Sequence, residues 1–397
     1  MFNFLSLKTE AFGLDISDLS LKIVKLKKKG RFLEVESFGK EDIPPGTIKE
    51  GEIEKEKELA QIIKGALKKV KGRKITTKYV VTSLPEEKAF FQVIQMPKVS
   101  KEDLRSAVIY EAENYIPLPI EDVYLDYRVI PPLQNSLDHL DVLISAIPKD
   151  IAHPYVSCLK MADLEPVVLE IESLAIIRAL VKNGVALSPI LLIDFGATRT
   201  SFIIFSGYSL RFTSSIAVSS NDFTEIIARN LQVKREEAER LKIKYGLEEK
   251  IKLKIKDEQS KVKRERGKIF EALIPALVDL IQQIKKHLYY YQTHASHEHL
   301  PPPSKGGPQF ADVKTGGQGV SKILLCGGGS NLKGLPEFLS SELKIPVELG
   351  NPLVNILAKE KKGALGLSFE EALGYTTTFG LALRGIKLKT LEEEQND

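Results

Sequence analysis

The sequence lacks the features that mark secreted, metal-stapled and membrane-spanning proteins. Its 397 residues include only two cysteines, whose spacing fits neither a zinc site nor a disulfide framework, and this indicates a reducing compartment. No apolar run approaches the roughly 18 residues of a transmembrane helix. The opening stretch MFNFLSLKTEAF shows neither the apolar core nor the cleavage site of a signal peptide. We therefore expect a cytoplasmic protein that contacts a membrane only peripherally.

Two common nucleotide-binding fingerprints are also missing. No G-x-x-x-x-G-K-[ST] run occurs, which excludes a P-loop, and no G-x-G-x-x-G follows the first predicted strand, which excludes a Rossmann site. The net charge of +4 does not by itself indicate a nucleic-acid partner. Residues 252–268 are basic enough to meet anionic lipid or nucleic acid, but they contain no aromatic residue for base stacking. We interpret them as a solvated helix face and expect no nucleic-acid partner.

The length and the order of apolar patterns indicate more than one domain. A chain of 397 residues exceeds one ordinary core. Alternating and helical periodicities predict mixed α/β structure, with a compact βαββαβ unit from Lys88 to Glu170 and a change of pattern from Ser188. The predicted segments are 1–87, 88–165, 166–187, 188–365 (with a mobile loop at 293–321) and 366–397 (ending in a frayed tail).

Two distant segments, GLDISDLSLKIVKL and LIDFGATRTSFIIF, repeat one local plan. Each has an apolar strand that ends in an Asp, a small residue two positions later, a hydroxyl five or six positions later, and then a second strand. A repeat of this kind suggests two similar half-domains. The corresponding pairs are Asp15 and Asp194, Ser17 and Gly196, and Ser20 and Thr200.

The chemistry of this repeat points to a polyphosphate. Backbone N–H groups in a tight turn form an anion site, and Asp can hold a hydrated Mg²⁺ between phosphate oxygens. We therefore predict that Asp15 and Asp194 flank a metal, although an Asp that caps its own turn is the alternative for Asp15. Lys22 either contacts a phosphate or points outward as an ordinary strand residue. A glycine turn at Gly327, Gly328 and Gly329 would admit a flat base or a sugar.

These motifs together resemble the actin-like ATPase superfamily, which has a ribonuclease-H-like fold with two α/β domains around a nucleotide cleft. The resemblance implies a five-stranded sheet in each domain and a βαββαβ insertion in the first, with 1–87 in the first domain and 188–365 as the second. FGLDISDLSLK resembles its first phosphate motif, LLIDFGATRTS its second and LLCGGGSNLKGL its adenosine motif. EIESLAIIRAL and GYTTTFGLALRG resemble its connecting helices, so the resemblance implies a connecting helix of the first domain in 166–187 and a second connecting helix with a tail in 366–397. The resemblance implies that ATP and Mg²⁺ bind, with contacts from Thr198, Asn331, Glu239 and Lys242. It also implies a role for Glu172, which could position an attacking water, where the alternative is a helix-surface acid. Because no second residue for general-base work stands out, we expect hydrolysis to be slow or absent.

Within that superfamily the sequence resembles the PilM family of type IV pilus assembly proteins. The stretch VIQMPKVSKEDLRSAVIYEAENYIPLPIEDVYLDYRVI resembles the family's inserted domain, which implies that 88–165 is an inserted partner-binding subdomain. The resemblance implies an adaptor that binds the cytoplasmic N-terminal peptide of a PilN-like membrane protein, contacts pilus motor ATPases, lies at the inner membrane through its partners and can form homo-oligomers. The sequence departs from the pattern at Ser17, where Gly is usual, and in its longer loop.

Two other functions remain open on the sequence. An FtsA-like polymerising cell-division protein would carry an amphipathic membrane helix at its end, whereas the last residues here, LEEEQND, are acidic. A small-molecule kinase of the same fold would need a catalytic acid and a substrate pocket, and no residue identifies either one.

Overall fold

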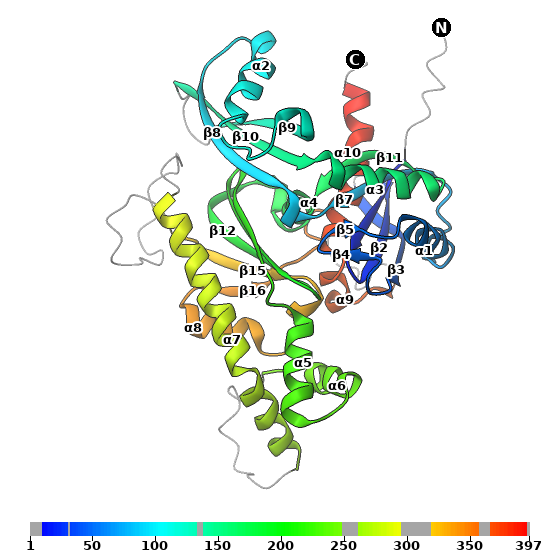
Figure 1. Cartoon of the computed structure of the whole chain (residues 1–397), viewed down its shortest axis with the longest axis vertical. Coiled ribbons are helices and arrows are strands. Elements are labelled where there is room, and N and C mark those ends of the chain that lie inside the picture. Colours follow the sequence, from blue (N-terminus) through cyan, green and yellow to red (C-terminus); the bar gives the residue numbers. More distant parts are fainter. Residues whose placement is uncertain are drawn as a thin grey trace. The chain divides into compact units, whose positions relative to one another are not determined.

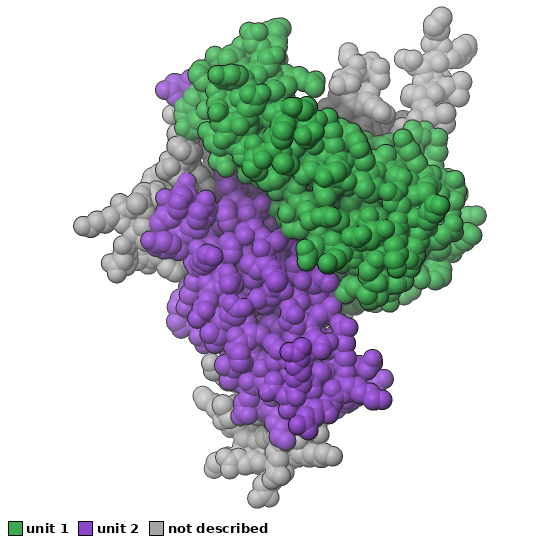
Figure 2. Space-filling view, in the orientation of Figure 1, with its two compact units in different colours: residues 1–129, 139–184, 351–397 green, residues 130–138, 185–350 purple. Residues whose placement is uncertain are grey.

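The computed structural model describes residues 10–30, 32–132, 138–247, 261–294, 319–356 and 366–394. The chain forms two compact units (Figure 2): unit 1 comprises residues 1–129, 139–184 and 351–397, and unit 2 comprises residues 130–138 and 185–350. Most of the predicted loop at 293–321 and part of the basic stretch at 252–268 lie outside the described residues.

Unit 1 is built on a six-stranded mixed sheet with the order β11-β7-β1-β2-β3-β6. β1 pairs in parallel with β7 and antiparallel with β2, so β1 lies inside the sheet. We expected five strands, and the sixth, β6, has only two residues. The strands are β1 (Phe12–Ser17), β2 (Ser20–Lys29), β3 (Phe32–Asp42), β6 (Lys71–Gly72), β7 (Tyr79–Leu84) and β11 (Glu165–Ile171); β4 (Ile48–Lys49) and β5 (Glu52–Ile53) form a separate hairpin.

Helices cover both faces of this sheet. α1 (Glu56–Lys68) and α3 (Lys149–Met161) contribute to one apolar core with β1, and α4 (Glu172–Leu180) and α10 (Thr376–Glu394) contribute to clusters on the other side. α10 packs closely on α4, because a Cβ at Gly380 would lie 1.8 Å from the Ala175 carbonyl oxygen. The short helix α9 (Phe369–Leu373) precedes α10.

The insertion contains a separate three-stranded sheet with the order β8-β10-β9 and the helix α2 (Figure 1). Its strands are β8 (Phe90–Pro97), β9 (Val123–Ile130) and β10 (His139–Pro148). α2 (Lys101–Ala112) packs on the sheet through Val108 and Ala112. Ser100 caps α2, because its hydroxyl accepts a hydrogen bond from the Asp103 N–H.

The six elements of the insertion follow the predicted βαββαβ order but do not form one module. β11 pairs with β7 and so extends the main sheet of unit 1. Tyr155 and Cys158 of α3 are buried in the core that α1 and β1 share. The α3 part of the predicted segment 88–165 therefore belongs to the first domain, because its apolar side chains are buried there, whereas β11 lies almost entirely in segment 166–187, which we predicted as first domain.

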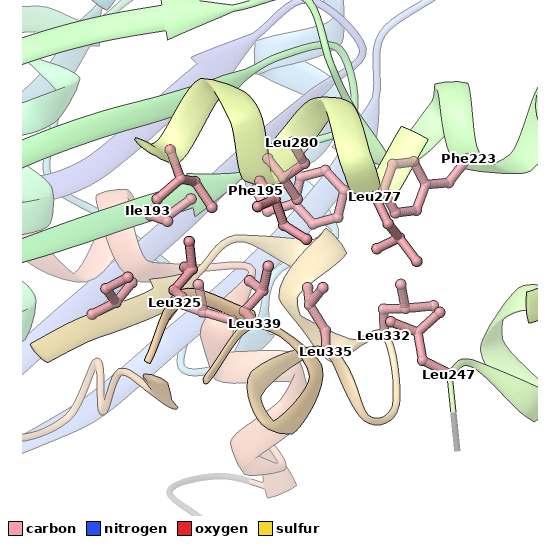
Figure 3. Packing of buried hydrophobic residues seen from close by; sticks show 14 of the residues in the cluster. Ile193, Phe195, Phe223, Leu247, Leu277, Leu280, Leu325, Leu332, Leu335 and Leu339 are labelled. Atoms are coloured by element: carbon pink, nitrogen blue, oxygen red, sulfur yellow. The ribbon is translucent and has the colours of Figure 1, made fainter. Parts of the chain in front are cut away.

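Unit 2 is built on a five-stranded sheet, as expected, with the order β14-β13-β12-β15-β16. Its strands are β12 (Ala186–Phe195), β13 (Thr200–Gly207), β14 (Ser209–Ile216), β15 (Lys322–Cys326) and β16 (Val347–Leu349). Its helices are α5 (Ser220–Leu231), α6 (Arg235–Tyr245), α7 (Lys261–His294) and α8 (Leu335–Leu343). Figure 3 shows apolar side chains of β12, β15, α7 and α8 meeting in one core, among them Ile193, Leu325, Leu277 and Leu339.

The second unit ends earlier than the predicted boundary at residue 365. Residues from 351 group with unit 1. Ile356 packs in an apolar cluster with Val24 of β2, and its carbonyl accepts a hydrogen bond from the Leu33 N–H at 3.3 Å. Among the described helices, none is long and apolar enough to cross a membrane.

Candidate functional site

The first candidate half-site is the β1–β2 hairpin of unit 1. Asp15 lies directly opposite Lys22 in the antiparallel register, and its carboxylate is 3.7 Å from the Lys22 ammonium. The carboxylate also accepts a hydrogen bond of 3.0 Å from the Ser83 hydroxyl, which in turn accepts one from the Ile16 N–H. Asp15 is almost fully buried, so these partners offset the cost of removing its charge from water. Lys22 thus points toward Asp15 and not outward.

A two-residue loop closes this hairpin between Ser17 and Ser20. The two serines are register partners, and the Ser17 hydroxyl donates to the Ser20 carbonyl at 3.3 Å. Asp18, in the loop itself, accepts a hydrogen bond of 3.0 Å from the Gly51 N–H. The Ser17 side chain therefore stabilises the turn that the sequence predicted as a phosphate-binding turn.

Glu172 begins helix α4 and contacts the segment that follows β7. Its carboxylate accepts a hydrogen bond of 3.5 Å from the Glu86 N–H, and the Glu86 carboxylate accepts one of 3.3 Å from the Ser173 N–H. This reciprocal arrangement joins the end of β7 to the start of α4. Burial raises the pKa of the Tyr155 hydroxyl well above its usual value, and the negative charges of Glu172, Asp18 and Asp15 add to that rise. The acidic side chains of this half-site therefore lie around Tyr155.

The second candidate half-site is the β12–β13 hairpin of unit 2. Asp194 pairs in register with Ser201 on one side and with Cys326 of β15 on the other. Its carboxylate occupies the space where a side chain of residue 327 would lie, since a Cβ at Gly327 would be 2.2 Å from the Asp194 Oδ1. Gly327 also has φ of +83°, a conformation that favours glycine. Residue 327, the first glycine of the predicted adenosine motif, must therefore be glycine, because any side chain there would clash with the Asp194 carboxylate.

The other two glycines of that motif have different surroundings. A Cβ at Gly329 would be 2.7 Å from atoms of Phe195, so this glycine allows the turn to pack on β12. A Cβ at Gly328 would meet no atom within 4 Å. Of the three, Gly328 is therefore the position where a ligand could approach bare backbone. Asn331 ends the short 3₁₀ helix Gly328–Asn331 that follows.

The turn at Gly196 is fastened to helix α5. The Gly196 N–H donates to the Arg199 carbonyl at 3.0 Å, and the Gly196 carbonyl accepts from the Ser220 N–H at 3.0 Å. Thr198 lies within this turn and is half-buried. Thr200 is fully buried, and its hydroxyl donates to the Val218 carbonyl at 2.6 Å. The structure therefore leaves Thr198 accessible and uses Thr200 internally.

Glu239 and Lys242 lie on α6 and join it to α5. The Lys242 ammonium donates to the Ser220 carbonyl at 2.9 Å and to the Thr224 hydroxyl at 2.7 Å, and it is 2.8 Å from the Glu239 carboxylate. Burial lowers the pKa of Lys242, while the ion pair with Glu239 opposes this shift. The Lys242 side chain is buried, whereas that of Glu239 remains 42% exposed. Glu239 is thus the member of the pair that can reach a ligand.

The donor chemistry of the half-sites suits Mg²⁺ held mainly by water. Mg²⁺ usually keeps several waters and binds one or two carboxylates together with substrate phosphates. Across the residues that the structure describes, no three His, Cys, Asp or Glu side chains converge to hold a metal ion. The single aspartate of a half-site is the kind of ligand that such a hydrated ion accepts.

A cavity of about 400 Å³ lies in unit 1 beside the three-stranded sheet of the insertion. We call it the partner pocket only because most of its lining comes from segment 88–165, for which the sequence predicts partner binding. Apolar side chains form most of its wall, with Asp126, Ser145 and Glu170 as polar members. The full lining is Leu84, Tyr124, Leu125, Asp126, Ser145, Ala146, Ile147, Ala152, Val156, Leu169, Glu170, Ile171 and Leu174.

Several residues of these sites escaped the sequence prediction. Ser83 contacts Asp15 across 68 positions, and Tyr155 donates to the Gly51 carbonyl across 104. The polar pair Thr82–Ser83 at the end of an otherwise apolar strand was the available signal for Ser83. No local pattern distinguishes Tyr155 from a core aromatic residue.

The fold of the chain is actin-like. EutJ from Carboxydothermus hydrogenoformans matches 94% of this chain and 89% of its own, with 14% identity and a TM-score of 0.50. MreB5 of Spiroplasma citri, in a structure bound to AMPPNP, matches 97% of this chain and 98% of its own, again with 14% identity and a TM-score of 0.50. The predicted fold class is thus confirmed.

The family follows from the sequence as a whole. The model of the type IV pilus assembly protein PilM family matches residues 13–300 and 309–386, and the chain belongs to this family. A solved structure described as the PilM-PilN type IV pilus biogenesis complex matches 96% of this chain and 99% of its own, with 27% identity and a TM-score of 0.71. The resemblance stated from the motifs is confirmed.

Proposed function

We propose that the protein is an ATP-binding adaptor of type IV pilus assembly that binds the cytoplasmic N-terminal peptide of a PilN-like membrane protein. The observation that carries this proposal is the match over 96% of the chain to a structure of the PilM-PilN complex. Family membership favours this function over a polymerising cell-division protein or a small-molecule kinase.

The partner pocket suits an extended, mainly apolar peptide. β9 supplies Tyr124, Leu125 and Asp126 to the pocket, and β9 is an edge strand of its sheet. An extended peptide beside such a strand can add main-chain hydrogen bonds, while the apolar wall receives its side chains. Tyr124 is half exposed, and its hydroxyl lies 2.9 Å from the His153 Nε2. This aromatic ring is a suitable anchor for the peptide.

We further propose that the protein binds ATP with Mg²⁺ through the two half-sites. Asp15 and Asp194 would hold the hydrated metal, and Lys22 would approach the phosphates. Thr198 and Glu239 would contact the nucleotide, with its base or sugar near Gly328. The Glu172 carboxylate accepts a hydrogen bond from the Glu86 N–H. Because it also has this structural task, we propose that hydrolysis is slow or absent.

The remaining parts of the proposal follow the family. The adaptor would lie at the cytoplasmic face of the inner membrane through its PilN-like partner, contact pilus motor ATPases and form homo-oligomers. None of these contacts requires a membrane-spanning segment in this chain.

A pulldown tests the adaptor function. The full chain is incubated with an immobilised peptide from the N-terminus of its cognate PilN-like protein, with and without Mg·ATP. We expect specific retention relative to a scrambled peptide. Failure to bind the peptide under both conditions would contradict the proposal.

The nucleotide site is tested with Asp194→Ala. Removing a carboxylate that orients a hydrated metal should weaken Mg·ATP binding by roughly 10- to 100-fold in calorimetry. Asp279→Ala, at an exposed position of α7 in the same unit, is the matched control and should bind as the wild type does. Equal affinity of Asp194→Ala and wild type would disprove the role of this residue.

A further inference from the structure

Helix α3 contributes to both the partner pocket and the first half-site. Ala152 and Val156 line the pocket. Between them, Tyr155 is only 1% exposed and packs in the core that includes β1. Its hydroxyl donates a hydrogen bond of 2.9 Å to the Gly51 carbonyl. A displacement of α3 by a ligand in the pocket would therefore act directly on Gly51.

Gly51 also contacts the β1–β2 hairpin of the first half-site. Its N–H donates to the Asp18 carboxylate at 3.0 Å, and Asp18 lies in the loop between Ser17 and Ser20. Both hydrogen bonds are buried, where water cannot readily replace a lost partner. The N–H and the carbonyl of Gly51 thus join the loop that closes the first half-site to α3.

Gly51 has little freedom to move independently of its neighbours. Its φ is +77°, and a Cβ at this position would lie 2.5 Å from Pro85. Pro85 directly precedes Glu86, whose carboxylate accepts from the Ser173 N–H of α4. A shift of Gly51 would therefore displace both the loop between Ser17 and Ser20 and the segment that contacts Glu172.

A second connection runs through the junction of β11 and α4. Glu170, Ile171 and Leu174 line the partner pocket. Glu172 lies between them in the sequence and contacts Glu86 in the first half-site. The pocket and the first half-site thus share two segments, α3 and the junction of β11 and α4.

We propose that Tyr155 is a positioning residue that couples the partner pocket to the nucleotide site through Gly51 and Asp18. This inference rests on the proposed function, since it needs a peptide in the pocket and a nucleotide at the hairpin. Because coupling is reciprocal, each ligand changes the affinity of the other by the same factor. Tyr155 touches neither ligand and acts by holding the loop.

The coupling ratio tests this role. We would measure the dissociation constant of a fluorescent PilN N-terminal peptide with and without saturating Mg·AMPPNP, by anisotropy on the full chain. The wild-type ratio should be about 5-fold or more, the lower end of usual allosteric coupling. In Tyr155→Phe the ratio should fall toward one while each ligand still binds alone. Asp18→Ala, which removes the other end of the relay, should have the same effect.

The control is Tyr375→Phe, which removes the hydroxyl of a tyrosine that is 9% exposed and packs in a different cluster of unit 1. It should keep the wild-type ratio. Melting temperatures show whether each variant is still folded. A merely structural tyrosine would weaken both affinities alike and leave their ratio unchanged. A wild-type ratio retained in both Tyr155→Phe and Asp18→Ala, or a ratio of one in the wild type, would overturn this inference and leave the proposed function intact. A wild type that binds no peptide or no nucleotide would overturn both.

Discussion

At the scale of residues, two aspartates with the same local sequence plan are held by different means. Asp15 is held by a serine from a neighbouring parallel strand and by the lysine opposite it. Asp194 instead lies against a glycine whose missing side chain makes room for the carboxylate. Both arrangements fix the carboxylate before any ligand arrives, which lowers the entropic cost of binding.

Gly327→Ala should therefore be far more damaging than Gly328→Ala. At residue 327 the new Cβ would collide with the Asp194 carboxylate, and the backbone has a positive φ. We expect the free energy of unfolding to fall by about 1–3 kcal/mol, together with nucleotide affinity, in denaturant titration and calorimetry.

The neighbouring Gly328→Ala is the matched control. Its Cβ would meet no atom within 4 Å, so stability should change by no more than about 0.5 kcal/mol. Equal stability of the two variants would show that the Asp194 carboxylate does not occupy the position assigned to it.

The sequence predicts the aspartates because their signal is local. An apolar strand, an acid and a polar turn are contiguous, and their repetition in the chain strengthens the inference. Ser83, Gly51 and Tyr155 could not be predicted in the same way, because their contacts join positions far apart in the sequence. Such contacts depend on which strands become neighbours in the sheet.

At the scale of elements, the order of strands and helices is predictable and their grouping is not. The periodicities of the insertion predict βαββαβ, and the six elements occur in that order. β11 nevertheless pairs with β7, and α3 is buried against α1, because their apolar faces complete the core of unit 1. Sheet membership is decided by this burial, which a local pattern does not contain.

His287 makes the attachment of α7 to its sheet sensitive to pH. Its ring is stacked on Phe202 with centroids 4.7 Å apart, and its Nε2 lies 2.9 Å from the Ser214 hydroxyl. Burial lowers the pKa of His287 in the folded protein below 6.5, the Gln283 carbonyl opposes this shift, and the charge of Lys286 adds to it. The unfolded chain then binds a proton more readily than the folded one, so stability is lost as the pH falls below 6.5.

We expect the free energy of unfolding in urea to be lower at about pH 5.5 than at about pH 7.5, and His287→Gln to reduce this difference. Glutamine keeps a polar group near Ser214 but does not titrate. An unchanged pH dependence in His287→Gln would show that other groups control the acid sensitivity.

At the scale of the whole molecule, the first unit carries both a candidate phosphate hairpin and the partner pocket. The second unit carries the other aspartate hairpin and the glycine turn. Family membership and the chain-wide structural match place this arrangement among pilus assembly proteins. The proposed adaptor would therefore bind the membrane partner and part of the nucleotide on the same domain. Segments of α3 and α4 would contribute to both binding sites.

The most direct test of this account is a peptide titration of a variant with a blocked pocket. Ser145 lines the partner pocket, and Ser145→Trp would fill part of its volume. Gln92 is an exposed residue of β8, and it pairs with Ile144, which lies beside Ser145 in β10, so its side chain belongs on the opposite face of the sheet. Gln92→Trp is therefore the control. We predict that the PilN N-terminal peptide binds the wild type and Gln92→Trp with equal affinity and shows no measurable binding to a folded Ser145→Trp. Undiminished binding to Ser145→Trp would contradict the central claim that this pocket receives the partner.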